Sequence, residues 1–204
     1  MNKMQNKKAK KREALLNSAY ELFITIGFSK TTILNISLNA GVGKGTFYLY
    51  FNDKDHIKNE LTRVKSSELL TKAANHLDKT NKELNFTDKI IFMIDFILEE
   101  LSKDLPLLKF VSKNLSWGIL SDASNYTKYD DAIDFQSFVA EKLKEEKVAF
   151  KTPELTIYTI IELVNSTCFN IILNKKPVPI DEFKPYLYKL IHSIVDDNLV
   201  KIKP

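Results

Sequence analysis

Glycine and proline are rare in this chain, and their rarity constrains its fold more than any other feature. The 204 residues include only five glycines and six prolines, and neither type occurs from Thr46 to Asp104. Without these breakers, long stretches of Leu, Ile, Lys, Glu and Asn favour helices. We therefore predict an all-α fold in which a glycine-punctuated head is joined by helix, not by a flexible linker, to a larger helical body.

The composition is that of an ordinary globular protein, with 44% hydrophobic and 27% charged residues. A single cysteine, Cys168, excludes an internal disulfide framework and suits the reducing cytoplasm. No apolar segment with a cleavage site follows the basic N-terminus, so we expect no signal peptide. The most apolar run, from Leu155 to Leu173, contains Glu162 and Asn165, which favours a buried or interface helix over a membrane span.

The sequence shows no recognisable catalytic or metal-binding motif. His56, His76 and His192 lack metal-ligand spacing, and Cys168 has no partner motif. The phosphate-binding patterns GxGxxG and GxxxxGK[ST] and the hydrolase pattern GxSxG do not occur. We therefore expect a protein that is not an enzyme and needs neither a cofactor nor a metal.

Positive charge gathers at the N-terminal end. Residues 1–65 hold twelve Lys or Arg and five Asp or Glu, a net charge of +7, whereas residues 66–204 carry −3. A basic head on a slightly acidic body is typical of a head that meets a polyanion. The alternative is a solvated basic tail, because six of these charges lie within residues 3–12, and charge alone does not separate the two interpretations.

The head reads as short helices separated by glycines. A first helix is expected over about 8–26, after a disordered basic tail at 1–8, and Gly27 ends it. Thr31 or Thr32 caps a second helix, which Gly41 ends. Gly43 opens a third helix over about 44–51. The side chains expected to face the core are Leu15, Ala19, Leu22, Phe23, Ile26, Ile33, Ile36, Ala40, Val42, Phe47 and Phe51.

Two short helices around a glycine turn are the parts of a helix-turn-helix, which places its second helix in the major groove of DNA. The motif spans about 32–51. Asn52 or Asp53 then caps a longer helix that runs toward Leu77. A stiff joint of this kind can transmit a movement between head and body.

The body is expected to contain five further helices, at about 88–102, 106–117, 131–148, 153–174 and 181–200. Thr87 is the predicted cap of the first, and Pro106 opens the second. Thr152 and Pro153 form a cap followed by proline at the first helical position. Residues 118–130 are expected to form a loop, and residues 175–179 a stiff break.

The segment from Lys11 to Ile57 resembles the DNA-binding head of the TetR family of bacterial transcriptional regulators. The matching residues are Leu22, Phe23, Gly27, Phe28, Thr31, Thr32, Ile36, Ala40, Gly41, Val42, Lys44, Gly45, Thr46, Tyr48, Phe51, Lys54 and Ile57. Two positions depart from the family pattern, which often has Ser where Gly43 stands and His where Tyr50 stands. The resemblance implies a DNA-binding domain at 9–57 and an effector-binding and dimerisation domain at 58–204.

The expected DNA-binding residues are Thr32, Gly43, Lys44, Gly45, Thr46, Tyr48, Tyr50 and Lys54. Thr32 lies at a helix start, where free N–H groups suit a phosphate. Lys44 and Thr46 lie at the start of the recognition helix, and Gly45 lets the backbone approach DNA closely. The tyrosines offer hydroxyls to phosphates or rings to sugars and thymine methyls. Lys54 sits unfavourably in a first helical turn, a penalty that a phosphate would remove.

For the body, the resemblance implies a homodimer and a small-molecule effector. The helices at 153–174 and 181–200 carry more apolar surface than one buried face needs, which favours a four-helix dimer interface, although burial within the monomer is the alternative. The candidate ligand-binding residues, for an apolar or aromatic effector, are Phe92, Phe96, Phe110, Trp117, Phe138, Tyr158, Glu162 and Phe169. The leading hypothesis is a ligand-responsive repressor that binds a palindromic operator, and the alternative is a protein-interaction or lipid-sensing helical module.

Overall fold

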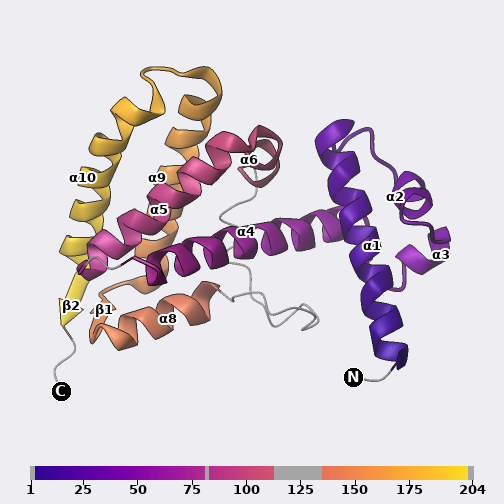
Figure 1. The fold of residues 1–204 in the computed structure, drawn as a ribbon, viewed down its shortest axis with the longest axis horizontal. Helices are drawn as coiled ribbons and strands as arrows, with labels where there is room; N and C mark the ends of the chain where they lie inside the picture. The colour runs from indigo at the N-terminus through magenta and orange to yellow at the C-terminus, as the bar shows by residue number, and fades with distance from the viewer. Residues whose placement is uncertain (1–2, 81–82, 113–134, 202–204) are drawn as a thin grey trace.

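The computed structural model describes residues 3–80, 83–112 and 135–201, which are mostly helical. In chain order the elements are α1 (Lys3–Thr25), α2 (Ile33–Asn39), α3 (Lys44–Phe47), α4 (Lys54–Asp78), α5 (Phe86–Lys103), α6 (Leu105–Val111), α8 (Phe135–Glu145), β1 (Val148–Phe150), α9 (Pro153–Asn174), α10 (Ile180–Asn198) and β2 (Leu199–Lys201). Figure 1 shows a small head of α1, α2 and α3 at one end, the body at the other, and α4 running between them.

The head folds around one apolar core, to which α1, α2, α3 and the start of α4 contribute. Its buried members are Leu15, Leu16, Ala19, Phe23, Ile36, Phe47, Phe51, Ile57 and Leu61. The predicted core faces are confirmed except at Ile26, which is exposed because α1 ends one residue earlier. Gly27 follows with φ +86°, a left-handed backbone that turns the chain away from α1.

α1 begins at Lys3, so the prediction of a disordered tail over 1–8 is wrong for residues 3–8. No glycine or proline precedes Gly27, and Lys, Gln and Ala favour helix, so the helix extends back beyond its apolar part. The side chains of Lys7, Lys8, Lys10 and Lys11 are exposed along it. These positive charges are therefore carried on an ordered helix.

The turn between α2 and α3 has the predicted signals. Thr32 and Asn35 form a capping box, in which the Thr32 hydroxyl accepts from the Asn35 N–H and the Asn35 side chain accepts from the Thr32 N–H, each at 3.1 Å. Gly41 adopts φ +67° and ends α2 sharply. Val42 is half-buried against the head core, as expected for a plug between two crossing helices.

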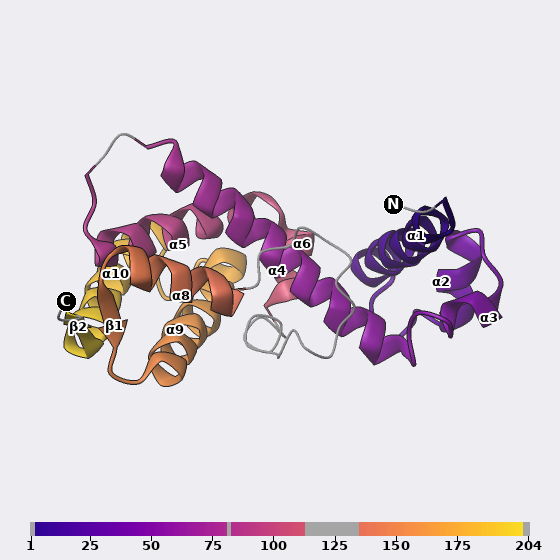
Figure 2. The same cartoon turned by 90° about the horizontal axis from the view of Figure 1, so that it is seen from below.

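α4 is a single 25-residue helix that begins in the head and ends in the body. Asp53 caps it by accepting a hydrogen bond from the His56 N–H at 2.7 Å, which confirms the predicted start. Ile57 and Leu61 pack in the head core, and Leu69 packs in a second core with α5 and α6. Figure 2 shows α4 passing from the head along the body. The predicted continuous joint is confirmed.

α6 joins the body to the head through Phe110. The Phe110 ring lies edge-on to Tyr20, with centroids 5.3 Å apart, and parallel to the ring of Phe23 at 6.2 Å. Leu108 and Val111, on the same helix, belong to the core shared with α4 and α5. Phe110 therefore packs at the joint between α6 and α1, and its part in a ligand pocket stays a prediction.

The body core forms where α5, α9 and α10 meet, and includes Leu98, Ile160, Cys168, Leu187, Ile191 and Val195. Pro153 opens α9 as predicted, although the Thr152 side chain makes no capping bond. α5 begins earlier than expected, because the Asn85 side chain caps it by accepting from the Asp88 N–H at 2.9 Å. The Thr87 hydroxyl instead donates to Asp196 of α10 at 2.8 Å.

The body also contains a small sheet that the sequence did not predict. β1 and β2 pair in antiparallel fashion, with Val148 opposite Lys201 and Phe150 opposite Leu199. The helix predicted to reach 148 ends at Glu145, because Lys147 adopts a left-handed φ of 54° that breaks it. The helix predicted to reach 200 ends at Asn198, because Leu199 has an extended backbone and pairs with β1. Predictions for residues 113–134, including the loop at 118–130, lie outside the described residues.

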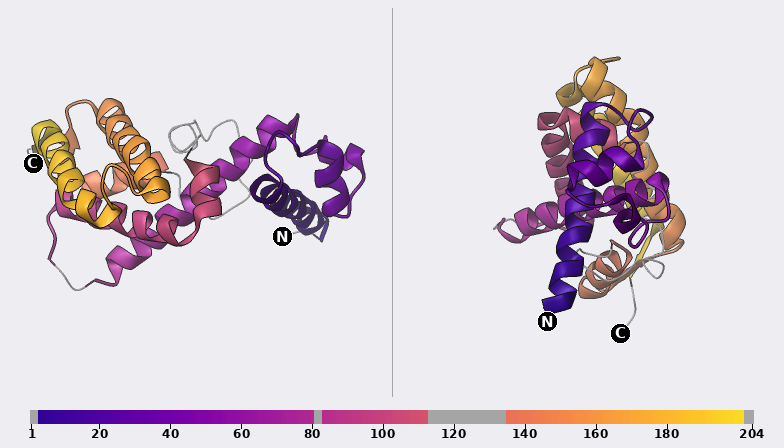
Figure 3. Two further views of the ribbon diagram at one scale, coloured as in Figure 1. Left: turned by 90° about the horizontal axis from the view of Figure 1, so that it is seen from above. Right: turned by 90° about the vertical axis from the view of Figure 1, so that its right-hand side faces the viewer.

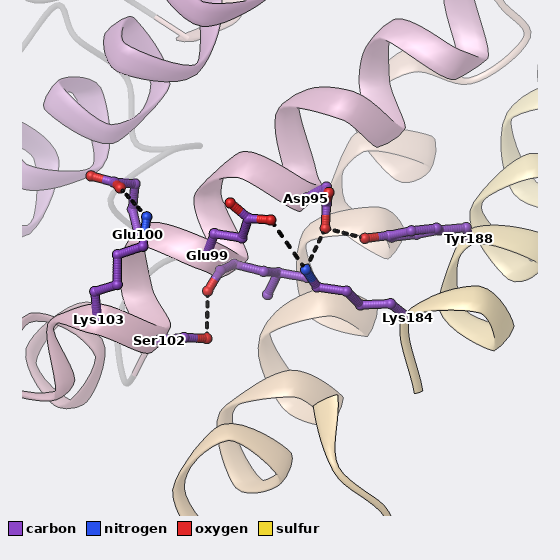
Figure 4. Close-up of polar contacts among 8 residues, drawn as sticks. Asp95, Glu99, Glu100, Ser102, Lys103, Lys184 and Tyr188 are labelled. Carbon is purple, nitrogen blue, oxygen red and sulfur yellow. Dashed lines mark hydrogen bonds and ion pairs between the residues drawn. The ribbon is translucent and has the colours of Figure 1, made fainter. Parts of the chain in front are cut away.

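A polar network ties α10 to α5. The Lys184 ammonium lies 2.6 Å from Asp95 and 3.7 Å from Glu99, and Tyr188 donates its hydroxyl proton to Asp95 (Figure 4). Burial and the hydrogen bond to Asp95 raise the pKa of Tyr188. α5 also packs along α4, the helix that joins head and body. The network therefore connects α10, through α5, to α4.

Candidate nucleic-acid interface

The recognition segment, residues 44–51, is one short helix followed by tight turns. α3 covers only Lys44–Phe47, four residues fewer than predicted. The winding nevertheless continues, because the Leu49 N–H donates to the Thr46 carbonyl at 3.2 Å and the Phe51 N–H donates to the Phe47 carbonyl at 3.0 Å. The segment therefore keeps helical faces through Phe51, with a narrower last turn.

These faces separate core contacts from exposed groups. Phe47 and Phe51 are fully buried, as predicted, and their ring centroids lie 5.6 Å apart. Tyr48 is 50% exposed and Leu49 is 79% exposed. Lys44 is exposed, whereas Thr46 and Tyr50 are half-buried. The segment thus has an anchored side and a free side.

Gly43 and Gly45 are not required by the fold of the monomer. Gly43 has an ordinary φ of −71°, and a Cβ added at either glycine would meet no atom within 4 Å. This contrasts with Gly41, whose left-handed backbone disfavours any side chain. Nothing in the described part of the head explains a glycine inside α3, where alanine would favour the helix. An external surface that approaches the backbone of Gly45 would explain it.

Two of the predicted DNA-binding residues, Thr32 and Lys54, form hydrogen bonds within the head. The Thr32 hydroxyl takes part in the capping box, although the residue is exposed. The Lys54 ammonium donates to the Phe28 carbonyl at 2.7 Å and to the Thr31 carbonyl at 2.9 Å, and lies 4.2 Å from the centre of the Phe28 ring. The charge of Lys54 in the first turn of α4 is therefore compensated within the head. The expectation that a phosphate is needed to remove an unfavourable charge there is wrong. Contact of Lys54 with a phosphate stays a prediction.

One basic residue of the head is buried in an ion pair. Arg12 of α1 donates to the Glu60 carboxylate of α4, and both side chains are almost completely buried. Arg63 lies 3.5 Å from the other oxygen of Glu60. In the sequence, Arg12 is one of the basic residues at 3–12 that were expected either to face a polyanion or to form a solvated tail, and the structure buries it instead. Its partner lies 48 residues away, so no local pattern could have found the pair.

Three exposed leucines of the helix-turn-helix were also missed: Leu34 and Leu38 on α2, and Leu49 after α3. Leu34 and Leu38 lie four residues apart, on one exposed face of α2. Leu49 lies between two tyrosines and was passed over in favour of hydrogen-bonding side chains. The signal that could have found it is its place opposite the Phe47 and Phe51 face.

The predicted ligand residues of the body lie in different places. Phe92 and Phe96 of α5 stack on His76, with centroids 5.3 and 4.7 Å apart. Phe138 lies near Lys142 on α8, Tyr158 is exposed on α9, and Glu162 is half-buried one turn later. Trp117 lies outside the described residues. The structure does not gather this set into one site.

A cavity of about 300 Å³ lies between the end of α6 and α9. Its lining residues are Ser112, Asn165, Ser166, Phe169 and Asn170. Asn165 donates a hydrogen bond to the Ser112 carbonyl at 2.9 Å, and the buried Ser112 hydroxyl has no hydrogen-bond partner among the described residues. Within the described part of the predicted set, Phe169 alone lines this cavity.

Comparisons with known proteins fit this geometry. Residues 15–61 match the family model described as "Bacterial regulatory proteins, tetR family". The chain is 23% identical to the HTH-type transcriptional regulator YhgD of Bacillus subtilis (strain 168), over 84% of this chain and 88% of that protein.

Two solved structures share the fold at low sequence identity. A TetR family transcription regulator from Marinobacter aquaeolei VT8 has a TM-score of 0.58 at 14% identity, covering 94% of this chain and 98% of that one. The transcriptional regulator FadR from Bacillus subtilis, in complex with stearoyl-CoA, has a TM-score of 0.54 at 16% identity, covering 90% and 98%. Head and body thus share an arrangement with known regulators, and the head also matches in sequence.

Proposed function

We propose that this chain, whose residues 15–61 match the TetR family of bacterial regulatory proteins, is a repressor that binds a palindromic operator as a homodimer and is released by a small-molecule effector. One observation carries this proposal: a basic helix-turn-helix head is fused through the unbroken α4 to an apolar helical body. Operator binding on the chromosome would place the protein in the cytoplasm. No step of this function requires enzymatic chemistry.

The DNA-binding domain would span residues 9–57, with α4 crossing its boundary with the body domain at 58–204. The exposed side chains of Lys44 and Tyr48 and the exposed backbone of Gly45 would enter the major groove. Thr46, Tyr50, Thr32, Gly43 and Lys54 would lie at its edges, near phosphates. The two recognition segments of a dimer would lie about 34–36 Å apart, or a multiple of that distance, to reach successive half-sites.

The dimer would form through α9 and α10. In the most apolar 18-residue stretch of α9, only 22% of the residues are buried within the monomer. Leu155 of α9 and Tyr186 of α10 are 65% and 59% exposed. The length and apolarity of α9 would also suit a membrane span, but it contributes Ile160, Cys168 and Ile171 to the body core. A second copy of the chain is a better cover for the remaining face.

The effector would bind in the body near α6 and α9. The cavity there combines one aromatic side chain, Phe169, with the polar side chains of Ser112, Asn165, Ser166 and Asn170. Because this lining is mostly polar, it would hold the polar end of an effector. Since the structurally similar FadR binds stearoyl-CoA, a long-chain acyl thioester is a reasonable first compound to test.

Effector binding would reach the head through α6. This helix borders the cavity at Ser112 and touches α1 of the head through Phe110. A shift of α6 would therefore move α1 and tilt α4, changing the distance between the two recognition segments. By linkage, the effector would lower the affinity for the operator by the same factor by which the operator lowers the affinity for the effector.

The central test is binding to DNA from the chain's own promoter region, compared with random duplex DNA, by fluorescence anisotropy. We expect tighter binding to the promoter, and a loss of about tenfold or more for Lys44→Ala with Tyr48→Ala. Lys144→Ala, which removes an exposed lysine of α8 outside the proposed interfaces, should bind as the wild type does. Binding that ignores sequence and survives the double substitution would overturn the assignment.

Salt dependence separates this proposal from the alternative. DNA binding predicts that log K falls with log salt concentration with a slope of about −0.9 per phosphate contacted. A flat response on random duplex DNA would instead favour a protein-interaction or lipid-sensing module.

A further inference from the structure

The free side of the recognition segment is almost devoid of hydrogen-bonding groups. Gly45, Tyr48 and Leu49 lie at positions i, i+3 and i+4, so they share one helical face, opposite Phe47 and Phe51. All three are exposed. Gly45 has no side chain, and the only polar side-chain atom on this face is the Tyr48 hydroxyl.

Leu49 stands out on this face. At 79%, its exposure exceeds that of every other large hydrophobic side chain in the described part of the chain. It follows the buried Phe47 by two residues and precedes the buried Phe51 by two, so the backbone on both sides of it is anchored in the head core. The leucine is therefore held outward on a fixed support.

The chemistry of the major groove limits what such a face can read. Among the four bases, thymine alone presents an apolar methyl group there, at C5, beside its hydrogen-bonding groups. A leucine cannot satisfy a base donor or acceptor, but it can cover a methyl group and exclude water from it. The open space above Gly45 allows the duplex to come close enough for this contact.

We propose that Leu49 is a specificity-determining residue that recognises the C5-methyl group of a thymine in each operator half-site, with the Tyr48 ring beside it. This inference rests on the proposed function, because it needs a DNA-bound head. The occupant is argued from charge as well as shape: the exposed Lys44 lies next to this face, and the head carries a net charge of +7 over residues 1–65. An apolar face beside an exposed lysine, on a head with a net positive charge, fits a polyanion better than it fits a protein surface of mixed charge.

The test removes the methyl group from the DNA. Wild-type protein first selects a preferred operator from a randomised duplex pool. Each thymine of one half-site is then replaced in turn by deoxyuridine, which lacks only the methyl group, and Kd is measured by anisotropy at fixed salt. We expect one or two positions at which the replacement weakens wild-type binding about fourfold, the factor that removal of one buried methyl group gives.

Leu49→Ala should weaken binding to the thymine operator and should bind the thymine and uracil forms equally at those positions. The matched control is Leu38→Ala, an exposed leucine on α2, which should keep the wild-type response to uracil at the same positions. The Leu49→Ala protein should also lose the thymine preference there when it is used for selection. Because Leu49 is exposed, circular dichroism and melting should show an unchanged fold.

The outcomes separate this inference from the function on which it rests. Sequence-specific binding with no methyl response, or with a response that persists in Leu49→Ala, would overturn the assignment of Leu49 and leave the operator-binding proposal intact. Selection that yields no preferred sequence would overturn the operator-binding proposal itself. A methyl response that is lost only in Leu49→Ala would establish the contact.

Discussion

Some basic residues of the head pair with groups inside it and others are exposed at its surface, and the sequence does not show which are which. Arg12 and Lys54 both belong to the segment whose positive charge predicts a polyanion partner, yet Arg12 pairs with the buried Glu60 and Lys54 binds two backbone carbonyls. Lys44, by contrast, is exposed beside the recognition face. Net charge is a sum over residues and carries no information about which of them point inward. Side-chain roles at this scale required the packed structure, whereas the buried Phe47 and Phe51 followed from their spacing alone.

The ion pair between Arg12 and Glu60 should be important for stability. Arg12→Met leaves a carboxylate that is only 1% exposed facing Arg63 alone, at 3.5 Å. We expect the free energy of unfolding to fall by about 3 kcal/mol, the lower end of the range for breaking a buried pair, because Arg63 still offers partial compensation. Urea denaturation followed by circular dichroism measures this change.

Two further variants sharpen that test. Arg12→Met combined with Glu60→Met should recover much of the loss, because both members of the buried pair are gone and Arg63, which loses its contact with Glu60, has a side chain that is 20% exposed to water. Lys58→Met, which removes a partner 3.8 Å from the exposed Asp55, should change stability by less than about 1 kcal/mol. Equal losses for Arg12→Met and Lys58→Met would show that the buried pair contributes no more than a surface one.

At the scale of elements, the helices with clear end signals were predicted well. The caps at Thr32 and Asp53 and the proline at Pro153 each mark a helix start in the structure. The sheet was missed because β1 and β2 have three residues each and pair about fifty residues apart. Such short strands show no alternation that could be told from a helix end. The joint between α6 and α1 was missed for a related reason: an aromatic ring on an amphipathic helix looks the same whether it packs on the head or lines a pocket.

Tyr20 offers a pH test of that joint. Burial, with smaller contributions from Asp104 and Glu68, raises the pKa of Tyr20 from 10.0 to about 12. Since the folded protein holds the phenolic proton more tightly than the unfolded chain, the stabilising contribution is complete below pH 10 and is lost as the pH rises toward 12. Stability of the wild type should therefore fall across this window.

Tyr20→Phe isolates the effect, because it keeps the ring that meets Phe110 and Lys65 and removes only the titrating hydroxyl. We expect the variant to lose less stability than the wild type between pH 10 and pH 12 in urea unfolding. Below pH 10 the difference between the two proteins should stay constant. Parallel losses across the window would mean that Tyr20 ionises in the folded joint as readily as in the unfolded chain.

At the scale of the whole molecule, the described chain places the two surfaces that we propose for DNA binding and for dimerisation at opposite ends. Figure 3 shows α9 and α10 far from the head, with α4 spanning the distance between them. A dimer formed through α9 and α10 would thus leave both recognition segments free to face DNA. Its geometry would depend on every contact in between, including the network of Asp95, Lys184 and Tyr188 that fixes α10 to α5. The sequence predicted the two ends, but not the packing that connects them.

Charge placed on the dimer surface should separate the two copies without unfolding either. In Leu155→Glu with Tyr186→Glu, each substitution replaces a largely exposed side chain, so the monomer fold and its circular dichroism should be unchanged. Across a two-fold interface, however, both carboxylates occur twice and lose water together, which opposes association. We expect a dimer for the wild type and a monomer for the variant in analytical ultracentrifugation.

Operator binding by this variant should weaken by about a hundredfold or more, because the second half-site contact is no longer intramolecular. Affinity for a single half-site should stay at the wild-type value, since the head is untouched. Leu105→Glu, on α6, is the matched control for an added surface charge and should remain a dimer. A variant that still sediments as a dimer would exclude this face as the interface. A monomeric variant with full operator affinity would mean that the two half-sites are bound independently, and that the body does not set the distance between the heads.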